Sequence, residues 1–104
     1  MSRMSRDKGK MAERDVERRL EQRGFHVLRE QDGRTQGADL LVNGTYAVEV
    51  KRRERLSLLD WHRQLEGRIP GHLVPVVAWR PNREPWRASL LFADLVDLIE
   101  EAGK

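Results

Sequence analysis

The stretch that most constrains the fold is residues 37–51, GADLLVNGTYAVEVK, in which two short apolar runs flank an Asn-Gly pair at positions 43–44. An Asn-Gly pair between apolar runs is a strong signal for a β-hairpin, so we expect one here. Three charges interrupt the hairpin: Asp39 at its start, and Glu49 and Lys51 at its end. Because a charge buried in a sheet costs free energy unless it is paired or bound to metal, these side chains indicate a function beyond folding.

The length of the turn decides whether the two carboxylates share a face of the hairpin. A two-residue turn would pair Asp39 with Val48 and leave Asp39 and Glu49 on opposite faces. A three-residue connection, or one bulge, shifts the pairing by one residue and brings Asp39 opposite Glu49. Glu49 and Lys51 share a face in either case, because side chains alternate along a strand. We therefore predict a three-residue or bulged turn.

If the three charges converge, they suit metal-assisted chemistry on a phosphodiester. Asp39 and Glu49 offer the hard oxygen ligands that Mg²⁺ or Mn²⁺ prefers. Such an ion lowers the pKa of a bound water and neutralises phosphate charge, while Lys51 orients the water or stabilises the phosphorane. A Glu-x-Lys pair is also common on ordinary exposed strands. The apolar neighbours Val48 and Val50 favour the functional interpretation.

The first part of the chain predicts a helix from about residue 8 to residue 23. Ala12, Val16 and Leu20 recur every four residues and form one apolar face. At 100° per residue, Glu13 lies only about 20° from Leu20, at the border of the buried face. A glutamate there is either a boundary residue partnered by an arginine or part of a site beneath the helix.

Between this helix and the hairpin we expect a short strand at residues 25–29 and a polar loop at residues 31–37. Arg34 and Thr35 in that loop come just before Asp39, so both are placed to touch a phosphate if the end of the hairpin is the site. Beyond the hairpin the chain carries a basic cluster of Arg52, Arg53 and Arg55.

The second half predicts a helix, two strands and a last helix. The pair Ser57 and Asp60 has the spacing of a capping box and predicts a helix that ends near Gly67, from which Gln64 could reach the site. Pro75 within the strand expected at residues 73–79 favours an edge position or a bulge. A strand at residues 86–91 and a helix at residues 92–102 follow. The residues of this last segment expected to face inward are Leu91, Leu95, Leu98, Ile99 and Ala102.

The resulting order is α-β-β-β-α-β, followed by β and α. The hairpin is apolar on both faces, which is typical of a central sheet covered by helices on each side, so we expect an α/β fold with a mixed sheet. With 104 residues the chain forms one domain. We assign residues 1–8 to a basic flexible arm and residues 9–104 to the domain.

Composition excludes several classes of function. The chain has no cysteine, which rules out disulfides, thiolate zinc sites and cysteine nucleophiles. Its three histidines, His26, His62 and His72, lack the spacing of a zinc site. The N-terminus has no apolar signal core and no stretch is apolar enough to span a membrane, so we expect an intracellular, cytoplasmic protein without a membrane partner.

These residues resemble the PD-(D/E)xK nuclease superfamily, whose signature stands here as Ala38-Asp39 and Glu49-Val50-Lys51. Within it the chain is most similar to the archaeal-type Holliday junction resolvases and their phage relatives. These proteins open with a basic arm and a helix motif that stands here at residues 9–16, GKMAERDV. Two features depart from the pattern: the proline of the superfamily's name is Ala38, and the serine that often precedes the aspartate is replaced at best by Thr35.

The resemblance implies a restriction-endonuclease-like core and a role for each motif residue. Glu13 would bind a metal directly or through water, Asp39 and Glu49 would be metal ligands together with the Val50 carbonyl, and Lys51 would be the catalytic lysine. The activity implied is Mg²⁺-dependent cleavage of four-way DNA junctions by a homodimer, with Mn²⁺ as a substitute. A two-fold dimer suits a junction that needs two symmetric cuts. Trp61, Trp79 and Trp86 are candidates for a dimer surface but suit the core better.

Several alternatives stay open at this stage. They are a nuclease of the same fold on other branched or duplex DNA, a catalytically silent DNA-binding module, and a ribonuclease or tRNA-processing factor. A complete set of Glu13, Asp39, Glu49 and Lys51 argues against the silent module. Phosphate contacts, largely blind to sequence, are expected from Arg3, Arg6, Lys8, Lys10, Arg14, Arg34, Thr35, Arg52, Arg53 and Arg55.

Overall fold

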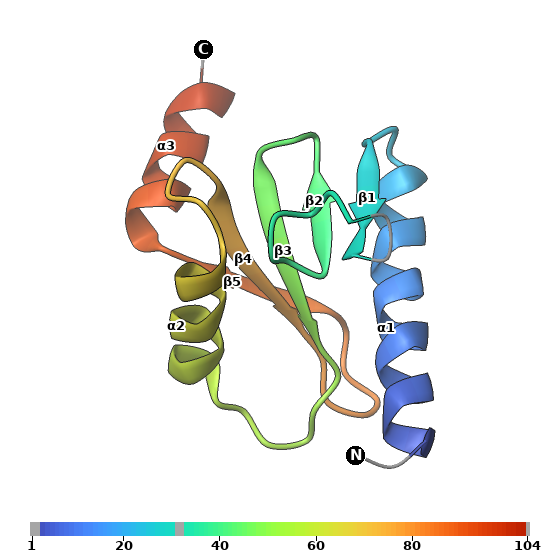
Figure 1. Ribbon diagram of the computed structural model, residues 1–104. Coiled ribbons are helices and arrows are strands. Elements are labelled where there is room, and N and C mark those ends of the chain that lie inside the picture. Colours follow the sequence, from blue (N-terminus) through green and yellow to red (C-terminus); the bar gives the residue numbers. More distant parts are fainter. Residues whose placement is uncertain (1–2, 31–32, 104) are drawn as a thin grey trace.

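The computed structural model describes residues 3–30 and 33–103, with side chains from Lys8 onward. Within these residues the chain forms three helices and five strands in the expected order (Figure 1). The elements are α1 (Arg3–Glu21), β1 (Val27–Arg29), β2 (Leu40–Val42), β3 (Tyr46–Lys51), α2 (Leu58–Arg68), β4 (Val74–Trp79), β5 (Arg87–Leu90) and α3 (Phe92–Ala102). None of the helices described is both long and apolar enough to cross a membrane.

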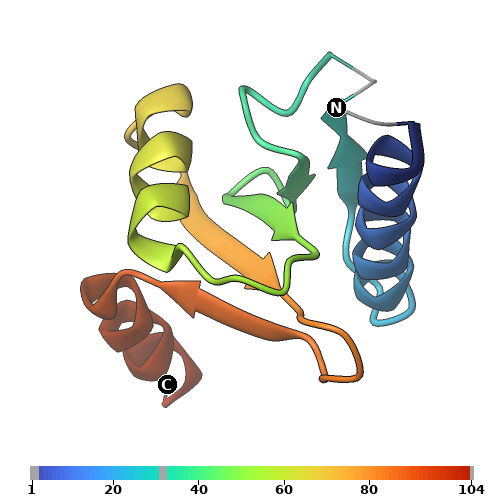
Figure 2. The ribbon, with the colours of Figure 1, turned by 90° about the horizontal axis from the view of Figure 1, so that it is seen from below.

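The five strands form one mixed sheet in the order β1-β2-β3-β4-β5. Only β3 and β4 run parallel, and the connection between them is α2; all other neighbours are antiparallel. The two helices α1 and α2 lie on opposite sides of the sheet (Figure 2). The predicted α/β class with a mixed sheet and helices on both faces is therefore confirmed.

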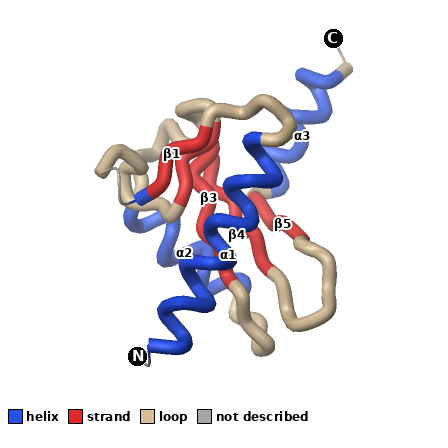
Figure 3. Tube along the Cα trace, turned by 90° about the vertical axis from the view of Figure 1, so that its right-hand side faces the viewer, coloured by secondary structure: helices blue, strands red, loops and turns tan. Residues whose placement is uncertain are grey.

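Each face of the hairpin contributes to a different half of the core, as its two-sided apolar pattern predicts. Leu40, Val42, Val48 and Val50 pack against Ala12 and Val16 of α1, which runs across this face of the sheet (Figure 3). On the other face Leu41, Ala47 and Val77 pack against Trp61 and Leu65 of α2. Helix α1 therefore lies directly over one face of the hairpin.

The hairpin turn has the predicted three-residue length. Leu40 pairs with Val48 and Val42 with Tyr46, so residues 43–45 form the connection. Asn43 and Gly44 both have positive φ, 52° and 67°, which is the left-handed conformation that Asn and Gly tolerate. The Asn43 side chain also accepts a hydrogen bond from the His26 N–H at 2.9 Å, which ties the turn to the start of β1.

Helix α1 begins at Arg3 and ends at Glu21, earlier at both ends than expected. Residues 3–8, assigned from sequence to a flexible arm, continue this helix. The side chains of Arg3 and Arg6 lie outside the described residues, so their contact with DNA stays a prediction.

Two local predictions in the second half of the chain need correction. Ser57 is the N-cap residue of α2, but its side chain makes no capping hydrogen bond, so the capping box is wrong. Pro75 lies in β4, an interior strand rather than an edge strand. It is tolerated there because β5 pairs with β4 only from Val76 onward, which leaves Pro75 on a locally open side.

The last helix was expected to turn its apolar face inward, and this is wrong. None of the residues of α3 is buried. Phe92 is 79% exposed and Ile99 is 62% exposed, while Asp94 and Asp97 line a hollow beside Tyr46 and Val74. The two faces of the sheet are already covered by α1 and α2, so α3, which follows the edge strand β5, leaves its apolar face to solvent.

Candidate active site

The hairpin register brings Asp39 and Glu49 to the same end of the sheet. Because Leu40 pairs with Val48, the residue before Leu40 lies opposite the residue after Val48. The Asp39 carboxylate accepts a hydrogen bond from the backbone N–H of Val50 at 2.9 Å, which fixes it against the start of the Glu49-Val50-Lys51 segment. The structure thus places the two motif carboxylates together. In this arrangement the Val50 N–H positions the Asp39 carboxylate. The role of the Val50 carbonyl stays a prediction.

Helix α1 and strand β1 add two further carboxylates. Glu13 from α1, Glu30 at the end of β1 and Asp39 each offer an oxygen within 4.8 Å of the other two, close enough to hold one metal ion. Glu30 is absent from the set that sequence reasoning identified. No pattern in the sequence marks Glu30, because it reaches Asp39 only through the antiparallel pairing of β1 with β2, where the Glu30 N–H donates to the Asp39 carbonyl at 3.0 Å.

Glu49 is held between two cations. Its Oε2 lies 2.7 Å from Nη2 of Arg68 and 3.4 Å from Nζ of Lys51, and its side chain is only 7% exposed. Its other oxygen, Oε1, is buried without a hydrogen-bond partner among the described residues. A buried carboxylate oxygen with no donor costs free energy, and a metal ligand position would satisfy it.

Lys51 and Arg68 complete the surroundings of Glu49. The Lys51 ammonium lies 5.9 Å from the centre of the Trp61 ring, so α2 limits where this side chain can point. Arg68, at the end of α2, was missed by sequence reasoning because nothing in the pattern of α2 distinguishes it. Gln64, the residue of α2 that could reach the site, is exposed, and its role stays a prediction.

Burial and mutual repulsion raise the pKa of two carboxyl groups in this cluster. Burial, with the neighbouring charges of Glu49 and Glu13, raises the pKa of Asp39 to about 7, although the hydrogen bond from Val50 opposes the shift. Burial also raises the pKa of Glu13, with Glu30 and Glu49 adding to the shift. A hard divalent cation would relieve the repulsion among these carboxylate oxygens.

The raised pKa of Asp39 predicts a pH-dependent cost to the metal-free fold. Its pKa in the folded chain is about 7, whereas the unfolded value is about 3.9. The destabilisation caused by ionised Asp39 therefore grows as pH rises from about 4 and is complete above about 7. In the presence of a chelator we expect Asp39→Asn to raise the free energy of unfolding by on the order of 1–3 kcal/mol at pH 8, and by less at pH 5. Thermal unfolding of both proteins at the two pH values measures this, and a gain that is larger at pH 5 would contradict it.

Gly37 fixes the distance between the start of the hairpin and the end of α2. Its φ is +106°, and a Cβ at this position would collide with the backbone carbonyl of Arg68. Gly37→Ala therefore forces both a strained backbone and a displacement of α2, with a cost of roughly 2–4 kcal/mol. Gly44→Ala is the matched control, because Gly44 also has positive φ, +67°, but an added Cβ would meet open space. Chemical denaturation should show a clearly larger loss for Gly37→Ala, and equal losses would exclude the close approach as the cause.

The cationic residues expected to contact DNA are mostly exposed. Arg52 is partly buried, and Thr35 is 3% exposed, which argues against the phosphate contact expected of it. The Thr35 carbonyl instead accepts the Ala38 N–H at 3.3 Å and shapes the loop before Asp39. The exposed cations of the expected set are Lys8, Lys10, Arg14, Arg34, Arg53 and Arg55.

A five-stranded mixed sheet of this order with three helices is consistent with the nuclease fold of the archaeal Holliday junction resolvases, so the expected resemblance to this branch of the PD-(D/E)xK nucleases is confirmed. In particular, the chain is similar to Hjc of Archaeoglobus fulgidus, a Holliday junction resolvase from an archaeal hyperthermophile. The two superimpose with a TM-score of 0.53 and 26% sequence identity, over 80% of this chain and 72% of Hjc. No model of a protein family and no curated protein sequence matches the chain.

Proposed function

We propose that the protein is a divalent-metal-dependent endodeoxyribonuclease that cuts four-way DNA junctions in recombination and repair inside the cell. One observation carries the proposal. In a fold shared with a Holliday junction resolvase, the carboxylates of Glu13, Glu30 and Asp39 gather within 4.8 Å of one another at one end of the hairpin. Glu49 and Lys51 lie at the same end of the sheet, 3.4 Å apart.

The carboxylates are the groups that would hold the metal. Glu13, Asp39 and Glu49 are the ligands expected from the motif, and Glu30 joins them by geometry. Mg²⁺ is the proposed ion, with Mn²⁺ as a substitute, because the described residues of the cluster offer carboxylate oxygens and no nitrogen or sulfur ligands. When bound, the ion supplies a water of lowered pKa and neutralises charge on the phosphodiester.

Lys51 and Arg68 act around the ion without binding it. The Lys51 ammonium lies 3.4 Å from Glu49, where it can hold the attacking water or stabilise the additional negative charge of the phosphorane. Arg68 anchors the same carboxylate at 2.7 Å and so fixes its orientation. We infer that Arg68 is a positioning residue, whereas Lys51 contacts the reacting groups.

We further propose that the protein acts as a homodimer that associates through α3. The apolar side chains of this helix project into solvent, and its four acidic residues are accompanied by no basic residue. An acidic helix repels DNA, so a protein surface is the better partner. The exposed apolar side chains on or next to α3 are Leu91, Phe92, Leu95, Val96, Leu98 and Ile99.

The activity is tested by incubating the purified protein with labelled four-way, flap and linear duplex DNA, in Mg²⁺ and in a chelator. We expect paired symmetric cuts in the four-way junction with Mg²⁺ and none with the chelator. If the flap or the duplex is cut as fast as the junction is, the proposed selectivity for junctions is refuted. The proposed nuclease activity would still stand. No cleavage of any substrate with Mg²⁺ or Mn²⁺ would refute the nuclease itself.

A further inference from the structure

A groove of about 1100 Å³ lies along α1, on the opposite flank of this helix from the cluster of Glu13, Glu30 and Asp39. Its walls are α1, the end of β3 and the connection from β4 to β5, which passes beside α1 (Figure 1). The six cationic side chains that line it are Lys8, Arg14, Arg18, Arg19, Arg52 and Arg80. A single acidic side chain, Asp15, lines it with them.

Helix geometry separates this groove from the candidate active site. Asp15 follows Glu13 by two residues, about 200° around the helix axis, so the two carboxylates leave α1 on opposite flanks. Arg14 lies between them and lines both the groove and the hollow that contains Glu13. A ligand in the groove would therefore lie across α1 from the scissile phosphate.

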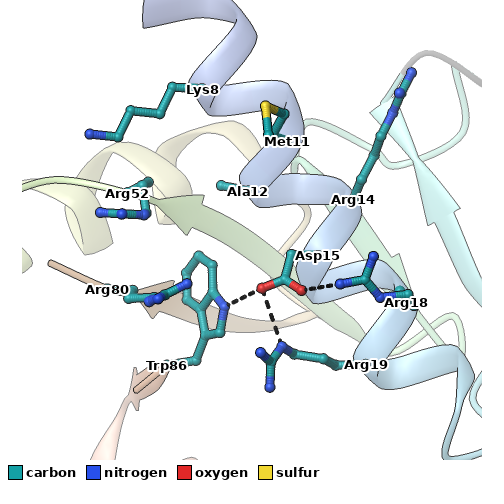
Figure 4. A pocket seen from close by; sticks show the side chains of 10 residues that line it. All are labelled: Lys8, Met11, Ala12, Arg14, Asp15, Arg18, Arg19, Arg52, Arg80 and Trp86. Carbon is teal, nitrogen blue, oxygen red and sulfur yellow. Dashed lines mark hydrogen bonds and ion pairs between the residues drawn. The ribbon is translucent and has the colours of Figure 1, made fainter. Parts of the chain in front are cut away.

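Asp15, the single acidic side chain that lines the groove, already has hydrogen-bond and ion-pair partners within the protein. Asp15 accepts a hydrogen bond from the Trp86 indole N–H at 2.8 Å and pairs with Arg18 at 2.6 Å and with Arg19 at 3.2 Å (Figure 4). These contacts fix the Trp86 ring against α1. They leave the charges of Lys8, Arg52 and Arg80 without compensation from Asp15.

Two of these cations are poorly satisfied. The Arg52 Nη1 atom is buried without a hydrogen bond among the described residues, and its charge partner Glu54 is 3.8 Å away. Arg80 donates a hydrogen bond from Nε to the backbone carbonyl of Glu84 at 2.6 Å. Because a carbonyl carries no net charge, this contact does not neutralise the positive charge of Arg80. A bound anion would neutralise both charges and accept hydrogen bonds from the guanidinium nitrogens that face the groove.

The remaining lining is apolar: Met11, Ala12 and Trp86 form a floor between the cations. An anion alone would not use this floor, whereas a DNA strand presents phosphates beside sugars and bases, and single strands stack on aromatic rings. We propose that the groove binds the sugar–phosphate backbone of a DNA strand other than the one being cut. This inference rests on the proposed function. It places α1 between two DNA strands of the same junction, with the strand that is cut on one flank and a second strand on the other.

The test measures junction binding without cleavage, in a chelator, as a function of salt concentration. Arg80→Gln and Lys8→Gln are each expected to weaken binding several-fold and to lower the slope of log affinity against log salt by about 0.9. Arg63→Gln is the matched control, because Arg63 is an exposed cation on α2, across the sheet from α1. A purely structural role for Arg80 or Lys8 would not change the salt slope.

Trp86 provides a second readout, because it lies in the groove itself. Junction DNA is expected to quench the tryptophan fluorescence of the wild-type protein, and Trp86→Phe should lose most of that change. The inference is overturned if Arg80→Gln and Lys8→Gln both bind with the affinity and salt slope of the wild type. Binding by the wild type without any cleavage would instead refute the proposed nuclease while the groove variants still test the groove. A wild-type protein that binds no DNA would overturn both.

Discussion

Replacing Asp39 with asparagine is expected to lower the cleavage rate of a four-way junction by at least about a thousandfold while leaving junction binding near that of the wild type. The reason is that Asp39 is central to the carboxylate cluster, within 4.8 Å of Glu13 and Glu30 and hydrogen-bonded to Val50. Losing a metal ligand removes several kcal/mol of transition-state stabilisation, and each 1.36 kcal/mol is a factor of ten in rate. The phosphate contacts expected of the arginines do not involve Asp39 and should persist.

The controls for this prediction separate lost chemistry from lost structure. Glu21→Gln removes the same single negative charge at an exposed position and should cut as the wild type does. Asp39→Asn should also be more stable than the wild type in a chelator at pH 8, because the uncharged amide avoids the burial cost of a charge and the repulsion from Glu49 and Glu13 that together raise the pKa of Asp39. Cleavage by Asp39→Asn at an appreciable fraction of the wild-type rate with Mg²⁺ would contradict the site.

Replacing Ile99 with glutamate is expected to convert a dimer into a monomer. Ile99 is 62% exposed on the apolar face of α3. Burying such a side chain contributes roughly 1.5–3 kcal/mol, and a two-fold axis uses each residue twice. The dissociation constant should therefore rise by at least about a hundredfold.

Leu59 supplies a closely matched control for that experiment. It is also 62% exposed, but it lies on α2. Sedimentation of Leu59→Glu should give the wild-type dimer, whereas Ile99→Glu should sediment as a monomer. If Leu59→Glu dissociates and Ile99→Glu does not, the dimer surface lies on α2. If the wild type is itself a monomer at all concentrations, α3 does not mediate self-association.

The hairpin and its turn could be predicted from sequence because one requirement decides them. A two-residue turn would place Asp39 and Glu49 on opposite faces, so the demand that both charges share a site selects the three-residue connection that the structure has. The helix pattern of Ala12 and Val16 likewise fixes which side of α1 packs on the sheet. Helix periodicity was sufficient for α1, whereas the turn needed strand alternation together with the requirement for a shared site.

The residues that were missed depend on tertiary pairing. Glu30 joins Asp39 only because β1 pairs with β2, and Arg68 reaches Glu49 only because the end of α2 approaches Gly37. The same limit explains the error at α3. The amphipathic pattern of Leu95, Leu98 and Ile99 predicts that an apolar face exists but not which surface covers it.

The proposed nuclease activity requires one divalent ion held among the side chains of Glu13, Glu30, Asp39 and Glu49. A crystal structure of the protein with Mn²⁺, with anomalous diffraction data, tests this most directly. We predict an anomalous peak within coordination distance of the Asp39 carboxylate and at least one other carboxylate of this set, and its loss in Asp39→Asn. A peak elsewhere on the molecule, or a cluster that remains empty at a metal concentration that supports cleavage, would contradict the account.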